Sequence, residues 1–267
     1  MSPGSLYVEG IGWWSPRLPG WELARAVLRG ERSAPPTAAA RPIAALLPST
    51  ERRRAPDAVL VALEVAMAAC AMAGREPKTL ASVFASSYGD LAVTDYLCET
   101  LAKTPAQLSP TKFHHSVHNA AAGYWTIATG APSPYTALAA GAHTFGTGLL
   151  SSLVQLAAED TPVLYVAYDV EARGPLATMV RSRGLLGVAL VLTPERTTAS
   201  RARLTWRVIP GAGEPSLPRA ENLEHVAGNA LEGCLALFEA LAEEGRRTLT
   251  QSLGPQLLLE LHVEPCE

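Results

Sequence analysis

The amino-acid sequence predicts a layered α/β fold. Strand-like and helix-like segments alternate along most of the chain, starting with a strand near 6–12 and a helix near 21–28. The segment 56–74 is apolar on most sides, which is typical of a helix that lies between two layers. The 46 residues of 113–158 include no Asp, Glu, Lys or Arg, so this stretch must be buried within the chain or covered by another subunit.

Local residue patterns define the individual elements. Pro56 and Asp57 begin the long apolar helix and Gly74 ends it, while the turn-rich residues 34–50 before it are expected to run over the surface. β-Branched and aromatic content indicates the strands, and the five before residue 195 fit one mixed sheet. Strands are expected at 6–12, 81–87, 133–138, 162–168, 187–192, 204–209 and 256–263, and helices at 21–28, 56–74, 91–102, 120–129, 141–156 and 223–244.

Composition narrows the class of protein. With 22 basic and 25 acidic residues the net charge is -3. The sequence has no basic stripe of the kind that binds nucleic acid, so no nucleic-acid partner is expected. The longest apolar segment, 55–73, carries Asp57 and Glu64, so we interpret it as a core helix and expect no membrane span. The N-terminus shows no secretory signal, which predicts a cytoplasmic protein.

The four cysteines form no CxxC pair, so neither a zinc site nor a redox dithiol is predicted. Cys70, Cys98 and Cys234 lie in Ala- and Leu-rich, helix-like contexts and are expected to be buried thiols.

Three histidines lie close together in the segment FHHSVHNAAAG. His114 and His118 could share one face of a helix, but no carboxylate follows until Glu159, so no metal and no cofactor is predicted. Ser116 or Thr136 could act as a nucleophile with one of the histidines as its base, although the chain has no GxSxG motif. An independent acyltransferase or thioester hydrolase that uses a Ser or Cys with a His is therefore the alternative hypothesis.

Two further segments have a structural and a functional interpretation. GAHTFGTG, at 141–148, lacks the ending of a phosphate-binding loop, so its glycines are better explained by helix packing. The run Glu51–Arg54 is either a solvated approach to the next helix or a contact for an acidic carrier protein.

The segment YTALAAGAHTFG, at 135–146, reads as a strand, a tight turn and a helix. A nucleophilic Cys or Ser is usual at such an elbow, because the helix dipole and free backbone N–H groups favour a thiolate or an oxyanion. Leu138 stands at that position and can perform none of this chemistry.

Five segments together resemble the N-terminal half of β-ketoacyl synthases, in the thiolase-like superfamily. The resemblance covers roughly residues 5–195, and in active members the elbow reads like TACASGANAIG, which puts Leu138 on the nucleophilic cysteine. The matching segments are LYVEGIGWWSP, ASVFASSYGD, SVHNAAAGYWTIATG, YTALAAGAHTFG and GVALVLTPE.

The resemblance implies a layered fold of the αβαβα type. Residues 1–195 would form the N-terminal thiolase half, and 196–267 an abbreviated C-terminal portion that packs on the same core. The 72 residues after 195 are too few for a full second half, where the family's catalytic histidines lie. Without the cysteine and these histidines, the chain alone is not expected to catalyse condensation.

The resemblance points most closely to the shortened ketosynthase-like subunits called chain-length factors, in particular those of aryl polyene biosynthesis. Such subunits form a heterodimer with an active ketosynthase and shape its acyl tunnel in polyene, polyketide or fatty-acid-type biosynthesis. An acyl carrier protein is a further partner to consider. The tunnel or vestigial site is expected at Tyr124, Trp125, Leu138 and Phe145, and the partner interface at His118, Asn119, Ala120, Tyr135, Thr136 and Ala137.

Overall fold

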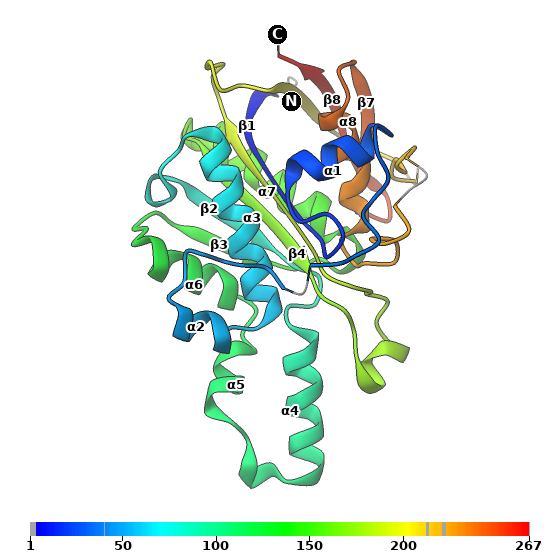
Figure 1. Cartoon of the computed structure of the whole chain (residues 1–267). Coiled ribbons are helices and arrows are strands. Elements are labelled where there is room, and N and C mark those ends of the chain that lie inside the picture. The colour runs from blue at the N-terminus through cyan, green and yellow to red at the C-terminus, as the bar shows by residue number, and fades with distance from the viewer. Residues whose placement is uncertain (1–3, 40, 212–213, 221–222, 267) are drawn as a thin grey trace.

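An eight-stranded mixed sheet organises the computed structural model, which describes residues 4–39, 41–211, 214–220 and 223–266 (Figure 1). The strand order is β3-β2-β4-β5-β1-β6-β8-β7, in which β2, β3 and β4 are parallel and the other pairs antiparallel. The strands are β1 (Gly4–Trp14), β2 (Ala81–Ala85), β3 (Tyr135–Leu138), β4 (Val163–Asp169), β5 (Leu186–Thr193), β6 (Ala202–Pro210), β7 (Arg247–Gly254) and β8 (Leu257–Pro265). The α-helices are α1 (Trp21–Leu28), α2 (Ser49–Arg54), α3 (Asp57–Ala73), α4 (Leu91–Lys103), α5 (Pro110–His115), α6 (Ala120–Thr129), α7 (Thr144–Glu159) and α8 (Leu235–Ala242).

Helix α3 packs directly on the centre of the sheet, as its apolar sequence predicts. Gly10 and Gly12 of β1 allow this approach, because a Cβ on either glycine would lie about 2 Å from a carbonyl oxygen of α3. On its other side α3 is covered by α6 and by the segment around Ala44 and Leu47, which joins the same apolar cluster. The helix therefore lies between two layers, as predicted.

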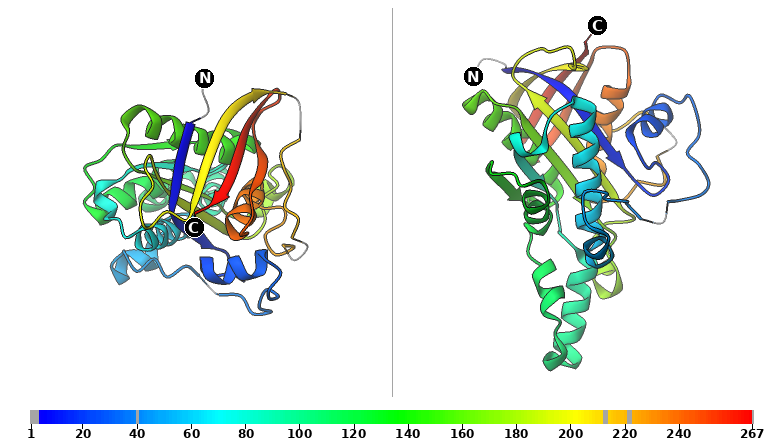
Figure 2. Two further views of the ribbon diagram at one scale, coloured as in Figure 1. Left: turned by 90° about the horizontal axis from the view of Figure 1, so that it is seen from above. Right: turned by 60° about the vertical axis from the view of Figure 1, so that its left-hand side comes forward.

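Helix α7 lies on the opposite face of the sheet, between the two ends of a strongly curved β layer. A Cβ on Gly146 would lie 2.3 Å from the carbonyl oxygen of Ser252 in β7, and one on Gly148 would lie 2.8 Å from Ala85 in β2. Gly146 and Gly148 are thus packing glycines, as predicted, whereas Gly141 has open space at its Cβ position and a φ of +56°, so for this glycine the prediction is wrong. Seen from above in Figure 2, β6, β8 and β7 turn away from the other strands, and β7 contacts α7.

The region after residue 195 continues this sheet. β6, β8 and β7 add to the free side of β1, and Leu204, Leu249 and Leu261 join the cluster that also contains α7. The other face of β6 alternates with this buried row and is exposed to solvent, so in the described residues no helix layer covers it. The division at residue 195 falls in the β5–β6 connection and stays a prediction.

Most elements before residue 195 lie where the sequence predicts them, but the last part differs. The predicted helix 223–244 is confined to Leu235–Ala242, because Gly228 adopts a φ of +76° and a loop with Asn229 replaces the first half. The predicted last strand at 256–263 is the second strand of a hairpin whose first strand, β7, the sequence analysis missed. Helix α2 was also missed, since none of its residues is buried and it has no apolar face to detect.

A helical arm projects from the sheet (Figures 1 and 2). It consists of α4, a short 3-10 turn at Pro105–Gln107 and α5, and its helices mainly contact one another. Leu101 and Phe113 on this arm are more than half exposed. The arm returns to the sheet at the segment that precedes α6.

Candidate functional site

The elbow lies where the carboxyl ends of three parallel strands meet. Leu138 at the end of β3 pairs with Ala85 at the end of β2, and Asp169 ends the neighbouring strand β4. Ligand sites in open α/β sheets are found at such an edge. The sequence-predicted elbow is therefore placed at the position where this class of fold carries chemistry.

The turn itself is held by local hydrogen bonds. Gly141 has a φ of +56°, and Gly141–His143 form one 3-10 turn before α7 begins at Thr144. The Thr144 hydroxyl accepts from the Ala140 N–H at 2.9 Å and donates to the Gly141 carbonyl at 2.7 Å. The predicted helix start at 141 is thus a 3-10 turn followed by the α-helix.

Leu138 offers only an alkyl side chain at this turn. It is half-buried and packs against the core cluster on the α7 side of the sheet. An alkyl group can neither attack a thioester nor exchange a proton. What this side chain contributes is volume and apolar surface at the end of β3.

A buried carboxylate lies next to the elbow, and the sequence analysis missed it. Asp169 accepts hydrogen bonds from the Ser86 hydroxyl at 2.9 Å and from the N–H groups of Ser87 and Tyr88 at 3.0 and 3.2 Å. Burial raises the pKa of Asp169 to about 6, and these hydrogen bonds limit the rise. A carboxylic acid at the end of an otherwise apolar strand, LYVAYD, was the available signal.

The cysteines lie outside the turn at 141–143, although Cys234 belongs to the segment Glu232–Cys234 that contacts α7. Cys70 and Cys234 are buried as predicted, and burial raises the pKa of the Cys70 thiol to about 12 and raises that of Cys234 further. Cys98 is exposed, so its predicted burial is wrong. It lies on α4, which projects away from the sheet (Figure 1). None of these thiols is part of the elbow.

The Ser–His pairs considered from the sequence do not form in the described residues. The Ser116 hydroxyl donates to the Phe113 carbonyl at 2.8 Å, and Thr136 lies on the exposed strand β3. His115 contacts the Tyr124 hydroxyl at 3.0 Å, and His118 contacts the Ser86 carbonyl at 2.8 Å. These two histidines are held by other partners.

A different Ser–His pair joins the elbow to β7. His143 Nδ1 lies 2.7 Å from Ser252 Oγ, and both residues are half-buried. In the described part of the chain no carboxylate contacts His143, so the pair has two members and no orienting acid. The sequence analysis missed this pair because its two residues are far apart in the chain and strand β7, which carries Ser252, was not predicted.

The residues predicted for the tunnel lie on both faces of the sheet. Trp125 is fully buried on the α3 side, where its ring centroid lies 6.4 Å from that of Phe84, and Tyr124 flanks the same cluster. Phe145 and Leu138 belong to the cluster on the α7 side. The four therefore form two pairs, and their role stays a prediction.

The residues predicted for the partner interface lie together at the β3 edge of the sheet. The Asn119 side-chain amide donates to the Tyr135 hydroxyl at 3.0 Å, which ties the start of α6 to β3. His118 and Ala120 flank Asn119, and Thr136 and Ala137 follow Tyr135 on the strand. Figure 1 shows β3 and α6 side by side at one margin of the molecule.

Part of the uncharged stretch is exposed on this side. Ile127 on α6 is 86% exposed and Tyr135 39% exposed, and Phe113 and Val117 before α6 also present apolar surface. Val154, on α7 at the other face of the sheet, is exposed as well. Burial of the whole stretch within the chain, one of the two expectations, is therefore wrong. Among the described residues, no further strand pairs with β3 at this edge of the sheet.

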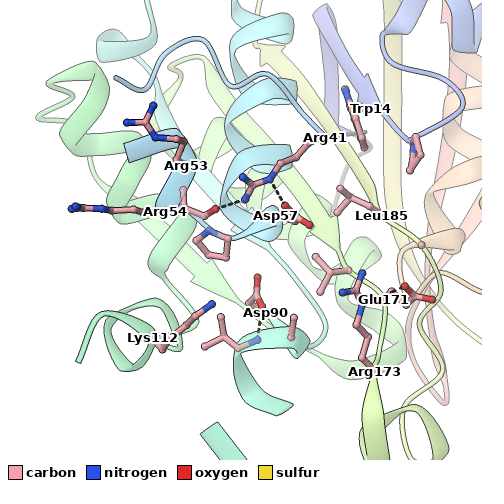
Figure 3. A pocket seen from close by; sticks show the side chains of 17 residues that line it. Trp14, Arg41, Arg53, Arg54, Asp57, Asp90, Lys112, Glu171, Arg173 and Leu185 are labelled. Atoms are coloured by element: carbon pink, nitrogen blue, oxygen red, sulfur yellow. Dashed lines mark hydrogen bonds and ion pairs between the residues drawn. The ribbon is translucent and has the colours of Figure 1, made fainter. Parts of the chain in front are cut away.

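A charged pocket of about 400 Å³ lies near α2 and the start of α4 (Figure 3). Arg41 donates to Asp57 at 2.6 Å, and Asp90 accepts from the Val93 N–H at 2.7 Å. Figure 3 shows Arg53 and Arg54 extending away from the Arg41–Asp57 pair. Both arginines are exposed, which fits the solvated interpretation of the Glu51–Arg54 run, and contact with a carrier protein stays a prediction.

Within the described residues, no three His, Cys, Asp or Glu side chains converge as a metal site would require. In the same part of the chain, no helix combines the length and hydrophobicity needed to cross a bilayer.

Comparison with solved structures shows what this fold is similar to. A chain of the ketosynthase (ApeO) in complex with its chain length factor (ApeC) from Xenorhabdus doucetiae is 21% identical, with a TM-score of 0.71 over 96% of this chain and 98% of that one. The ishigamide ketosynthase/chain length factor gives 14% identity and a TM-score of 0.71, over 99% of this chain and 100% of that one. A chain of the AntDE:AntF complex, a type II PKS acyl-carrier protein with its ketosynthase, is 9% identical, with a TM-score of 0.73 over 99% of this chain and 100% of that one.

These likenesses confirm the predicted thiolase-like fold. No curated protein sequence matches the chain. Residues 28–253 match the family described as beta-ketoacyl synthase, N-terminal domain, a match that extends well past residue 195. The chain therefore belongs to the beta-ketoacyl synthase family, by its N-terminal domain.

Proposed function

We propose that this protein is a non-catalytic ketosynthase-like subunit of the chain-length-factor type. It binds an active ketosynthase as a heterodimer in the cytoplasm and shapes the acyl tunnel of that partner in polyene, polyketide or fatty-acid-type biosynthesis. The observation that carries the proposal is the uncovered β3 edge, where a strand without charged residues ends the sheet.

The backbone of β3 is available to a partner strand. The carbonyl groups of Pro134 and Leu138 accept from β2 at 3.2 Å each. Because backbone groups alternate sides along a strand, Tyr135 and Ala137 direct their N–H and C=O groups away from β2. A strand of the ketosynthase can pair there and extend the sheet across the interface.

Exposed apolar side chains lie on α6, which contacts this edge, and in the segment before it. Ile127 projects from α6 beside β3, and Phe113 and Val117 precede the same helix. Such a patch is typical of a protein–protein interface. The complexes of ketosynthase with chain length factor among the similar structures support the choice of partner.

The non-catalytic assignment rests on the elbow. Decarboxylative condensation needs a nucleophile that holds the acyl chain, and Leu138 cannot supply one. The side chain instead fixes the volume at the end of β3, next to the proposed interface. We therefore expect Leu138, with Tyr124, Trp125 and Phe145, to influence product length through packing.

Co-expression with an active ketosynthase tests the proposal. A stable 1:1 complex is expected, and Ala137→Pro should reduce co-purification at least tenfold, because proline removes the outward N–H without breaking the β2 ladder. Ala137→Val keeps that N–H and is the matched control. A chain that purifies alone as a monomer, with no affinity for a ketosynthase, would contradict the heterodimer.

Product length tests the role in the tunnel. Leu138→Phe and Leu138→Ala should shift the length distribution in opposite directions while condensation continues. Trp125→Ala is less informative, because removing a fully buried tryptophan costs about 3–5 kcal/mol of stability. Unchanged products in every tunnel variant would instead indicate a purely stabilising scaffold.

The alternative function is an independent acyltransferase or thioester hydrolase, which the His143–Ser252 pair favours. Incubation with an acyl thioester followed by intact-mass analysis separates the two. The leading proposal predicts no covalent adduct. An adduct that disappears in Ser252→Ala would establish the alternative.

A further inference from the structure

The helical arm is joined to the rest of the chain at two points. α4 begins after β2, where the Asp90 side chain accepts the Val93 N–H at 2.7 Å, and α5 leads back through residues 116–119 into α6. Between these points the two helices mainly contact one another (Figures 1 and 2). The order of the arm therefore depends on the contacts at its two ends.

His115 makes the contact at the end where the arm returns. Within α5, whose six residues the structure describes, it alone is buried, with 4% of its surface exposed. Its Nε2 lies 3.0 Å from the Tyr124 hydroxyl of α6, and the centroids of the two rings are 6.0 Å apart. This side chain therefore ties the end of α5 to α6.

A histidine in this position can change its charge near neutral pH. The titratable groups around it are Lys112 and His114 on α5, Tyr124 on α6, Asp90 at the start of α4 and Glu51 on α2. Burial lowers the pKa of His115, the neighbouring His114 and Lys112 lower it further, and Asp90 and Glu51 oppose the shift. The neutral imidazole is thus the form that suits the buried contact.

We propose that protonation of His115 releases the end of α5 from α6, so that the arm is anchored near neutral pH and loosened in mild acid. In the released state the imidazole is solvated and has its ordinary pKa of 6.5, which is above its pKa in the anchored state. The anchored state is therefore favoured above this pH and loses stability as the pH falls below it. The release concerns this chain alone, so the inference does not depend on the proposed heterodimer.

Hydrogen–deuterium exchange of the full chain at pH 7.5 and 5.5, corrected for the pH dependence of chemical exchange, tests the inference. Protection of residues 112–118 should fall about fivefold at the lower pH, because the released state then gains a proton. His115→Gln keeps a polar side chain beside Tyr124 but cannot take up a proton, so this protection should change less than about twofold. His262→Gln, on β8, is the matched control and should behave like the natural chain.

Tyr124→Phe tests the contact itself. It removes the hydroxyl that lies beside His115 Nε2, so the protection of 112–118 should already be lower than in the natural chain at pH 7.5. Four results would each overturn the inference. They are equal protection of the natural chain at both pH values, an equal loss in peptides from α3, the full pH-dependent loss in His115→Gln, and unchanged protection in Tyr124→Phe. Three of the four do not require that His115→Gln folds.

Discussion

The two edges of the sheet are built in opposite ways. At the β7 edge the loop residue Ser216 donates its N–H to the Thr250 carbonyl at 3.0 Å, and its hydroxyl accepts the Thr250 N–H at 2.9 Å. At the β3 edge no element of the described chain pairs with the outward backbone of Tyr135 and Ala137. The β7 edge is therefore capped by a loop of this chain, whereas the backbone of the β3 edge is open to pairing with another chain.

The same contrast appears in the charges. Arg247, the first residue of β7, forms a buried ion pair with Glu239 and contacts Glu243 at 3.2 Å. The stretch around β3 has no charged residue, and natural sheets usually protect an exposed edge with charges, bulges or a covering loop. In the described part of the chain β3 has none of these three protections, which supports the proposal that a partner covers it.

The largest expected effect tests the closed edge. Arg247→Met leaves Glu239 buried with only the N–H groups of Arg219 and Ala220 as donors, so the free energy of unfolding should fall by about 3–5 kcal/mol. Urea denaturation measures this loss. Arg207→Met breaks the ion pair with Glu260 at the surface and should hardly change the midpoint of urea denaturation. Equal effects of both changes would contradict the closed-edge interpretation.

The centre of the sheet, between the two edges, should respond to pH. The pKa of Asp169 is about 6 in the fold against an ordinary value of 3.8, so between these pH values the native state holds a proton that the unfolded chain has released. Stability therefore falls as pH rises through this window, by an amount on the order of 3 kcal/mol.

Asp169→Asn cannot titrate and should lack this loss. The difference in unfolding free energy between the variant and the natural chain, measured from pH 4 to 6.5, should change in favour of the variant. A difference that stays constant with pH would show that Asp169 ionises normally.

Substitution of two helical glycines, one beside each edge of the sheet, compares the packing at these edges. Gly146→Ala pushes a Cβ against the β7 backbone and should destabilise the chain by about 2 kcal/mol. Gly123 on α6 has open space around its Cβ position, so Gly123→Ala should stabilise the isolated chain by about 0.5–1 kcal/mol. Thermal unfolding measures both, and a destabilising Gly123→Ala would mean that the β3 side is more crowded than the structure shows.

The smallest effect on the isolated chain is expected for Ile127→Glu. This side chain is already exposed, so stability should change by less than about 0.5 kcal/mol. Binding to a ketosynthase should nevertheless weaken at least tenfold, because a carboxylate would be buried at the interface. Val208→Glu, on the exposed side of β6, is the control and should leave binding unchanged. Equal affinities of the two variants would move the interface away from α6.

The fold was most predictable where the sequence signal is local. β2, β4 and β5 are short, mostly apolar runs that are buried throughout, and the structure confirms each within one or two residues of its predicted limits. The segment 223–234 is less apolar and contains Gly228 and Asn229, and it forms a loop instead of the predicted helix. The prediction followed its leucines and alanines and gave these two residues too little weight.

The candidate site was predictable in part for the same reason. The elbow and Leu138 are consecutive residues, so their arrangement follows from local geometry. Asp169 reaches Ser86, and His143 reaches Ser252, across separations of 83 and 109 residues. Such contacts depend on strand order, which the sequence pattern does not encode.

The sequence by itself determined the alternation of strands and helices, the apolar elbow and the uncharged stretch, because each depends on neighbouring residues. Only the tertiary structure decided which edge of the sheet stays open and which side of that stretch is exposed. It also brought residues 215–218 and 223–233 close to the turn at 141–143. The physical reason is that strand order and curvature bring distant segments together, and burial is a property of that assembly rather than of any one segment.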